Sequence, residues 1–309
     1  MKRLFEFITV AVVLAALGAC APATPAAPPQ PSSTPSEAVA ATTMPGPAAA
    51  AIVPATGPSA MPEVLIEARD FSYMMTESIS AGWVRVRLTN SGQEPHHVQF
   101  LRLNDDVNFE QFKEALKQGE GPALALVKQM GGVGVIAPTG AAQVVLNLSA
   151  GRYVLICFVP SPNDHVPHLA KGMIQPITVQ EATGAGVKEP TADLTVTLKD
   201  FAFDLPETLP AGPTTIKVVN DGPEPHEMNL LLLADGKTAA DVMQYLGAPA
   251  GPPPFTPVGG MNGLDPGSVG YVEFDFKPGN YVAICNIPSP HAGGSPHFAL
   301  GMIKAFTVK

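Results

Sequence analysis

The sequence is poor in charge, in cysteine and in long apolar runs. Charged residues make up 15% of its 309 residues, against about a quarter in an average soluble protein. This low content argues against a charge-rich disordered chain and against a coiled coil. Three cysteines cannot form the disulfide framework of a small secreted scaffold. The net charge is −9 without any block of Lys and Arg, so binding to nucleic acid is not expected.

The only pronounced apolar run lies at the N-terminus. Residues 7–17 carry no charge, follow Lys2 and Arg3, and are too few to span a bilayer, which is typical of a secretory signal. The run ends in Leu17-Gly18-Ala19-Cys20, which resembles the bacterial lipobox. Residues 1–20 are therefore predicted to be a lipoprotein signal peptide, with Cys20 lipidated. The alternative is an ordinary signal cut near Ala21, and both alternatives predict an extracytoplasmic protein.

A stretch without core-forming residues follows. Residues 21–60 contain ten prolines, thirteen alanines and a single charge, Glu37. Such a composition cannot bury a core, so a disordered tether is expected. With Cys20 lipidated, the tether would hold a globular head away from the membrane, at a periplasmic or cell-surface location.

The rest of the chain consists of two copies of one sequence repeat. Residues 64–101 align with residues 194–231 at an offset of 130 without a gap, and Glu94-Pro95-His96 meets Glu224-Pro225-His226. Further on, the segments that end in Cys157 and Cys285 align at an offset of 128. One long period present twice indicates duplicated domains. The predicted domains are residues 61–181 and 193–309, joined by a linker at 182–192.

The local patterns within each unit are mainly those of β-strands. Residues 84–88 and 216–219 alternate, and residues 98–101, 143–148 and 271–276 are further strand candidates between Gly and Pro. One short helix is expected per unit: Phe109, Phe112 and Leu116 have helical spacing, as do Val242, Tyr245 and Leu246. The expected fold is all-β, with two tandem β-sandwiches that each carry a helical insertion.

Residues able to bind a soft metal recur in both units. All seven histidines lie either in the Glu-Pro-His turn or in the loop after the cysteine, and a methionine follows each Pro-His by five positions. Two imidazoles, a thiolate and a weak thioether form the ligand set of a blue copper site. The candidate ligands are His96, Cys157, His168 and Met173 in the first unit, and His226, Cys285, His297 and Met302 in the second.

These motifs resemble those of the cupredoxins, the plastocyanin/azurin family. Asn-x-Gly followed by Pro-His, Gly-x-Tyr-x-x-x-Cys, and Pro-His-x-x-x-Gly-Met occur once in each unit. The resemblance covers roughly residues 62–180 and 193–309. It implies a Greek-key sandwich of eight strands per domain, one type 1 copper ion per domain, and one-electron transfer with redox partner proteins.

Two features depart from the family pattern. The loops between cysteine and histidine, residues 158–167 and 286–296, are longer than usual and rich in proline. The family often places Asn after the first histidine to brace the ligand loop, whereas His97 and Glu227 occupy those positions here. Both departures bear on the shape and the bracing of the metal site.

The same residues are also compatible with other structures and functions. Cys157 and Cys285 could form a disulfide between the domains. His165 and His291 do not align with each other and are expected to face solvent, and strand alternation predicts that His97 points away from the metal. Multicopper oxidases and copper nitrite reductases need additional ligands in His-x-His pairs, which are absent from the sequence. A non-enzymatic electron carrier is therefore expected; the alternatives are copper storage or delivery, and a metal-free scaffold.

Overall fold

The computed structural model describes residues 61–75, 78–182 and 187–309. The predicted signal peptide, Cys20 and the predicted tether lie outside these residues, as does part of the predicted linker. Within the described ranges, none of the helices combines the length and the apolar character that crossing a membrane requires.

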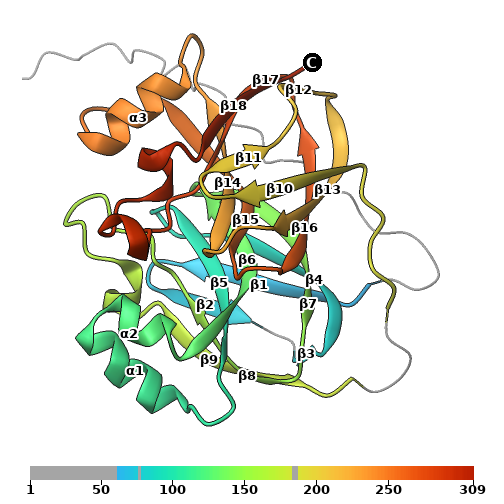
Figure 1. Cartoon of the computed structure of the whole chain (residues 1–309), viewed down its shortest axis with the longest axis vertical. Coiled ribbons are helices and arrows are strands. Elements are labelled where there is room, and N and C mark those ends of the chain that lie inside the picture. The colour runs from blue at the N-terminus through green and yellow to red at the C-terminus, as the bar shows by residue number, and fades with distance from the viewer. Residues whose placement is uncertain (1–60, 76–77, 183–186) are drawn as a thin grey trace, which may run out of the picture. The chain divides into compact units, whose positions relative to one another are not determined.

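Each repeat contributes nine strands in the described parts of the chain (Figure 1). The first repeat contains β1 (Glu63–Arg69), β2 (Ser72–Met75), β3 (Ile79–Ser80), β4 (Gly82–Asn90), β5 (His96–Leu103), β6 (Val127–Ile136), β7 (Ala141–Leu148), β8 (Gly151–Ile156) and β9 (Ile174–Gln180). The second contains β10 (Leu194–Lys199), β11 (Ala202–Asp204), β12 (Thr208–Leu209), β13 (Gly212–Asn220), β14 (His226–Leu233), β15 (Phe255–Leu264), β16 (Val269–Phe276), β17 (Gly279–Ile284) and β18 (Ile303–Val308). The predicted all-β class is confirmed.

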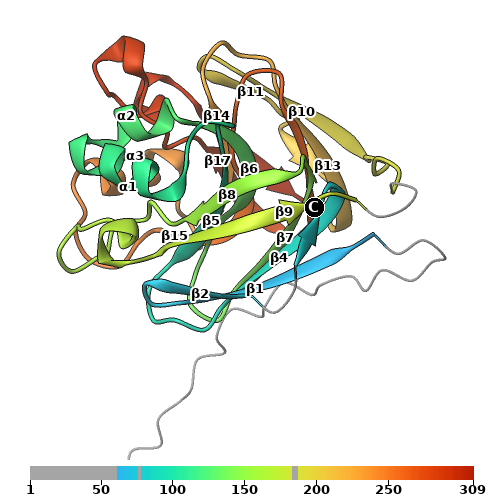
Figure 2. The ribbon, with the colours of Figure 1, turned by 90° about the horizontal axis from the view of Figure 1, so that it is seen from below.

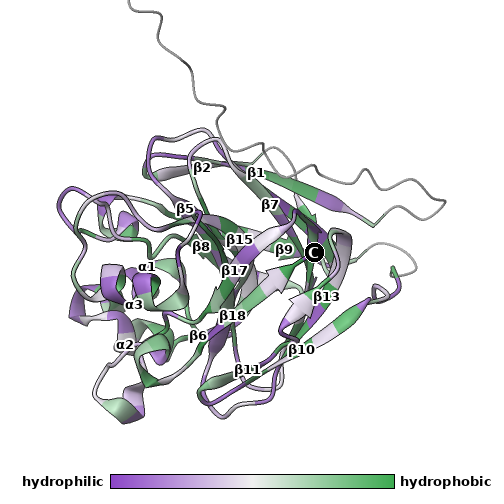
Figure 3. Ribbon diagram, turned by 90° about the horizontal axis from the view of Figure 1, so that it is seen from above, coloured by the Kyte–Doolittle hydropathy of each residue, from purple (hydrophilic) through white to green (hydrophobic). Residues whose placement is uncertain are grey.

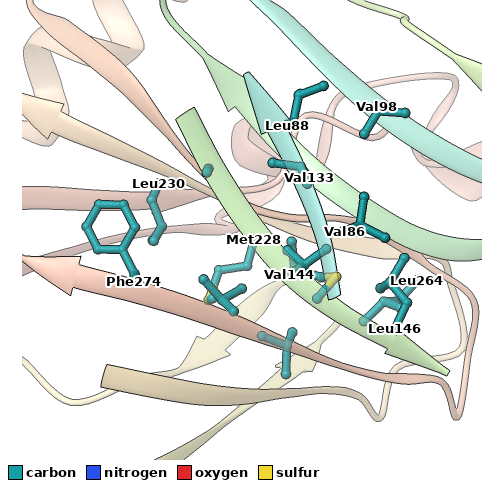
Figure 4. Packing of buried hydrophobic residues seen from close by; sticks show 14 of the residues in the cluster. Val86, Leu88, Val98, Val133, Val144, Leu146, Met228, Leu230, Leu264 and Phe274 are labelled. Atoms are coloured by element: carbon teal, nitrogen blue, oxygen red, sulfur yellow. The ribbon is translucent and has the colours of Figure 1, made fainter. Parts of the chain in front are cut away.

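The strands form two sheets that run through both repeats. One has the order β11-β10-β13-β16-β7-β4-β1-β2, and the other β12-β18-β17-β14-β15-β6-β5-β8-β9-β3. A large buried core lies between the sheets and includes side chains from both repeats (Figure 4), among them Val86, Val144, Leu230 and Phe274. The repeats therefore share sheets and core beyond the connection along the chain.

The seam between the repeats has approximate two-fold symmetry. Val144 on β7 lies opposite Val272 on β16, and Val133 on β6 lies opposite Met261 on β15. Both pairs differ by 128 positions, the offset that relates the two repeats in this part of the chain. Each of these residues therefore faces its own counterpart, as in the isologous interface of a symmetric dimer.

Polar contacts across the seam follow the same symmetry. Gln99 donates its side-chain amide to the carbonyl of Gly263 at 2.9 Å. Its counterpart Asn229 accepts the backbone N–H of Val135 through Oδ1 at 2.8 Å. Because Gln99 and Asn229 are both buried, these bonds satisfy groups that would otherwise lose their hydrogen bonds to water.

Helices cover the outer face of the ten-stranded sheet. In the first repeat α1 (Phe109–Gln118) and α2 (Glu120–Leu124) pack Phe112 and Ala123 against the outer side of β5 and β8. In the second, α3 (Ala239–Gly247) packs Val242 in the same way against β14 and β17. Figure 2 shows the helices together on one side of the sheet, and Figure 3 shows that the helices contain both polar and apolar residues.

The helix predictions hold, with one addition. Thr238 and Asp241 form a capping box at the start of α3, and α1 begins at a similar box made by Asn108 and Gln111. The first repeat contains a second short helix, α2, that the sequence pattern did not predict. Gly119 ends α1 with φ 130°, so the chain turns there and a new helix starts at Glu120.

Candidate metal centres

A turn held by a buried asparagine presents the first histidine of each repeat. Asn90 binds the carbonyl of Glu94 through Nδ2 at 2.8 Å and accepts the N–H of Gly92 through Oδ1 at 2.9 Å. Asn220 makes the equivalent bonds in the second repeat, at 2.9 and 3.0 Å. This geometry accounts for the repeated Asn-x-Gly motif, because the side chain replaces a backbone turn.

The glycine of this motif leaves room for the ligand ring. A Cβ atom at Gly92 would lie 2.8 Å from Nε2 of His96, and one at Gly222 would lie 2.6 Å from Nε2 of His226. Any larger residue would displace the imidazole. His96 and His226 begin β5 and β14, and both are fully buried.

The other ligands lie on one strand end and its loop. The amide of His168 binds the carbonyl of Val159, and the amide of Leu169 binds the carbonyl of Cys157, both at 2.9 Å. In the second repeat the amides of His297 and Phe298 make the same two bonds, to Ile287 and Cys285. A 3-10 turn begins at each histidine, η1 (His168–Lys171) and η3 (His297–Leu300), and the glycine that ends each turn has the positive φ that glycine tolerates best.

The long loops do not open the sites. Pro160 pairs with Pro167, and Pro288 pairs with Pro296, as isolated β-bridges. Each bridge closes the loop on the side of the ligands, so the additional residues project beyond it. His165 and His291 lie in these outer parts and are exposed, as expected.

The ligand atoms converge once in each repeat. His96, Cys157 and His168 form the first cluster, and His226, Cys285 and His297 form the second; the ligand atoms of each lie within 4.8 Å of one another. Nδ1 of His96 is 3.0 Å from Nδ1 of His168, and Sγ of Cys157 is 3.5 Å from the latter. The corresponding distances in the second cluster are 3.0 and 3.3 Å. All six side chains are 0% exposed.

The two predicted methionine ligands are held beside the clusters by backbone contacts. The amide of Cys157 binds the carbonyl of Met173, and the amide of Met173 binds the carbonyl of His168. Cys285, Met302 and His297 repeat this arrangement. Both methionines are fully buried, and coordination of copper through their sulfur atoms stays a prediction.

Four carboxylates that the sequence reasoning did not identify as functional contact the histidines. Nε2 of His96 lies 3.0 Å from Asp70, and Nε2 of His168 lies 2.8 Å from Glu94. In the second cluster, His226 lies 2.5 Å from Asp200 and His297 lies 2.9 Å from Glu224. The signal was present in the sequence, since Asp-Phe and Glu-Pro-His recur at the offset of 130.

The residue after the first histidine braces the ligand loop in both repeats. His97 accepts the backbone N–H of Phe158 through Nε2 at 2.8 Å. Glu227 accepts the backbone N–H of Asn286 through Oε1, also at 2.8 Å. Different side chains thus tie the first ligand strand to the residue after the cysteine. His97 is not one of the residues of the first cluster, and the direction of its side chain relative to the metal stays a prediction.

Cys157 and Cys285 are free and buried, so the alternative of a disulfide between them is not realised. Burial raises the pKa of Cys157 to about 12, and burial together with the nearby Glu227 raises the pKa of Cys285. The thiols therefore stay protonated at neutral pH until a cation replaces the proton, which couples metal binding to proton release.

Burial of His97 predicts a pH-dependent stability. Loss of hydration lowers the pKa of His97 to about 3, with the neighbouring His168 as a smaller cause. The unfolded chain, with an ordinary histidine pKa near 6.5, therefore binds more protons than the folded chain between about pH 3 and 6.5. The stability that the neutral, buried His97 contributes to the folded state is fully present above pH 6.5, and it is lost as pH falls through this window. The His97→Gln variant keeps an acceptor for the backbone N–H of Phe158. In this variant the free energy of unfolding should fall less steeply as pH decreases.

The measurement is the free energy of unfolding of metal-free protein by denaturant, at several pH values between 4 and 7. His165→Gln is the control, since His165 is exposed. An unchanged pH dependence in His97→Gln would contradict the assignment.

The donor set of each cluster fits copper. If the carboxylates accept the Nε2 protons, the two Nδ1 lone pairs face each other at 3.0 Å and need a cation between them. Two imidazoles, one cysteine sulfur and a nearby methionine match the His₂Cys set with a weak axial thioether that is typical of blue copper sites. The two clusters thus fit a two-domain cupredoxin with one copper ion in each repeat.

Comparisons with known proteins give distant matches only. No protein-family model and no curated protein matches the chain. Among solved structures, dithionite-reduced auracyanin from Roseiflexus castenholzii is 23% identical over 38% of this chain and 95% of its own, with a TM-score of 0.28. Auracyanin A, a blue copper protein from Chloroflexus aurantiacus, is 17% identical over 39% and 99%, with a TM-score of 0.24. A multicopper oxidase is 17% identical over 80% and 88%, with a TM-score of 0.23.

Proposed function

We propose that this chain is an extracytoplasmic electron-transfer protein with two type 1 copper sites, one in each repeat. The observation that carries the proposal is the presence of two buried His/Cys/His clusters, in each of which the Nδ1 atoms of the two rings face each other. The same arrangement is built twice from corresponding residues, although the neighbouring side chains differ between the repeats.

The protein residues would hold the ion in a fixed and dry environment. The backbone bonds of Cys157 and His168 fix the positions of two ligands, and the strand that begins at His96 supplies the third. A bound copper ion would supply one-electron exchange between Cu(I) and Cu(II), since thiolate and thioether favour Cu(I) and imidazole suits both states. A rigid sandwich limits rearrangement of the ligands between the two states.

Electron transfer is favoured over copper-based catalysis. In the described residues the two clusters are the only groups of three or more His, Cys, Asp or Glu side chains that could hold a metal ion. Of the three histidines outside the clusters, His97 accepts a backbone N–H, and His165 and His291 lie in exposed loops. A catalytic copper centre in addition to these two clusters would therefore need ligands from outside this part of the chain.

The location and the partners form part of the proposal. The apolar run before Cys20 supports export and a lipid anchor on Cys20, and residues 21–60 would act as the tether. The partners would be redox proteins, reached from the membrane surface. The second candidate function is copper storage or delivery without a redox cycle; of these, the burial of both clusters favours storage, since burial restricts exchange with solvent species.

The deciding experiment is metal analysis and visible spectroscopy of the region from Met61 onward after loading with Cu(II). We expect two copper ions per chain, an intense thiolate-to-Cu(II) band at the red end of the visible spectrum, and reversible reduction at an electrode. Two bound ions without this band and without a reversible couple would favour storage. Absence of binding would favour a metal-free scaffold.

A further inference from the structure

The second nitrogen of every ligand histidine contacts a carboxylate. The carboxylate pairs are defined as Asp70 with Glu94 at the first cluster, and Asp200 with Glu224 at the second. An ionised carboxylate can only accept a hydrogen bond, so the contacted Nε2 atom has to carry the proton. The neutral ring then has its lone pair on Nδ1, the atom that faces the metal position.

The carboxylates are themselves held in place. Asp70 accepts the backbone N–H groups of Gln93 and Glu94 as well as the His96 contact. Backbone N–H donors of this kind favour the ionised form of a carboxylate and hold Asp70 beside the ring. In the second cluster, the buried hydroxyl of Ser289 donates to Oε1 of Glu224 while Oε2 contacts His297.

The contact at Nε2 decides which ring nitrogen of each histidine is left for a metal ion. Nε2 of His96 and His168 faces Asp70 and Glu94, and Nε2 of His226 and His297 faces Asp200 and Glu224. A carboxylate at Nε2 selects the tautomer that carries its proton there and leaves the lone pair on Nδ1.

We propose that the carboxylate pairs are positioning residues that set the Nε2–H tautomer of all four ligand histidines and lower the reduction potential of both copper ions. This inference rests on the proposed copper sites. Reduction adds one electron from the electrode or partner and converts Cu(II) to Cu(I). Two nearby negative charges, passed on through the imidazoles, stabilise Cu(II) more than Cu(I) and so oppose that step.

The tautomers can be tested without metal. Long-range ¹H–¹⁵N spectra of the metal-free full chain distinguish a protonated Nε2 from a protonated Nδ1. We expect His96, His168, His226 and His297 to carry the proton on Nε2. Protonation on Nδ1 at both histidines of one cluster would overturn the assignment there. Because no copper is present, this result stands whether or not the proposed function is correct.

The charge effect is tested with Glu94→Gln and Glu224→Gln, each in the full chain. Glu94→Gln should weaken Cu(II) binding at the first cluster by about 10- to 100-fold, as removal of an outer hydrogen-bond partner does at other metal sites. If Cu(I) binding is weakened tenfold less than Cu(II) binding, the reduction potential rises by about 59 mV for one electron. The copper affinity and the reduction potential of the second cluster should be unchanged in Glu94→Gln. Those of the first cluster should be unchanged in Glu224→Gln.

Each variant thus contains its own control in the unmodified cluster. Glu114→Gln, an exposed residue of α1 paired with Lys117, controls for loss of a negative charge elsewhere. If the wild type shows two reversible redox couples but neither Gln variant changes a reduction potential, the carboxylate proposal is wrong and the copper proposal stands. If the wild type shows no couple, the proposed function fails instead. If one variant does not fold, the other decides the question.

Discussion

The Cys157→Ser variant is expected to bind one copper ion instead of two. The serine hydroxyl does not provide the soft thiolate that binds copper, so the first cluster should lose its ion. The second cluster lies in the other repeat and has its own cysteine. The thiolate-to-Cu(II) band should fall to the contribution of the second cluster. Metal analysis and the visible spectrum of the loaded protein measure both effects.

Cys285→Ser is the matched experiment for the second cluster. Each single variant should retain one copper ion, and the double variant should retain none. Ser161→Ala is the control, because Ser161 is buried in the loop after Cys157 but is not one of the cluster residues. Two copper ions per chain in either single cysteine variant would refute the ligand assignment for that repeat.

Replacing Val144 with Asp is expected to destabilise both repeats together. Val144 is fully buried at the seam, opposite Val272. A carboxyl group placed there has no partner, and burial of an unpaired charge typically costs about 3–5 kcal/mol. Because the core and both sheets are shared, the loss should not be confined to the first repeat.

The measurement is unfolding by denaturant, followed through the far-UV signal and, in loaded protein, through the copper band of each cluster. All signals should shift together to lower denaturant concentration. Asn147→Asp is the control, since Asn147 lies on the same strand and is exposed. Separate transitions for the two clusters would show that the repeats unfold independently and would contradict this prediction.

Much of the fold and the ligand set could be predicted because the chain contains the same pattern twice. A single His or Cys has many structural explanations, but His96 and Cys157 recur as His226 and Cys285 in matching surroundings. The strand and helix patterns were also clear, because periodicity depends on neighbours that are close in sequence. The domain limits drawn from the repeat stay predictions.

The features that the sequence did not reveal depend on contacts between distant residues. Asp70 and His96 are 26 positions apart, and Glu94 and His168 are 74 apart. Their motifs could be seen to repeat, but the topology alone brings each carboxylate to the outer nitrogen of a ring. The seam between the repeats also depends on contacts between distant residues. β7 and β16 pair across the repeats, but each strand alone has the sequence pattern of an ordinary strand.

The braces at His97 and Glu227 show why matching residue types was insufficient. An imidazole and a carboxylate differ in shape and charge, yet each offers an acceptor to the backbone N–H after the cysteine. Position on the strand determines this role more than chemical identity. A search for asparagine at these positions therefore finds a departure from the family pattern, although the hydrogen bond is present.

The β-bridges across the two ligand loops separate the copper ligands from the loop tips. The tip sequences of the two repeats have diverged, with Asn163-Asp164-His165 in one and Ala292-Gly293-Gly294 in the other. Since the proline pairs fasten the base of each loop, the tips are suitable places to insert a short peptide tag. Such a tag would allow the protein to be attached to a conducting surface in two defined orientations, through one repeat or the other.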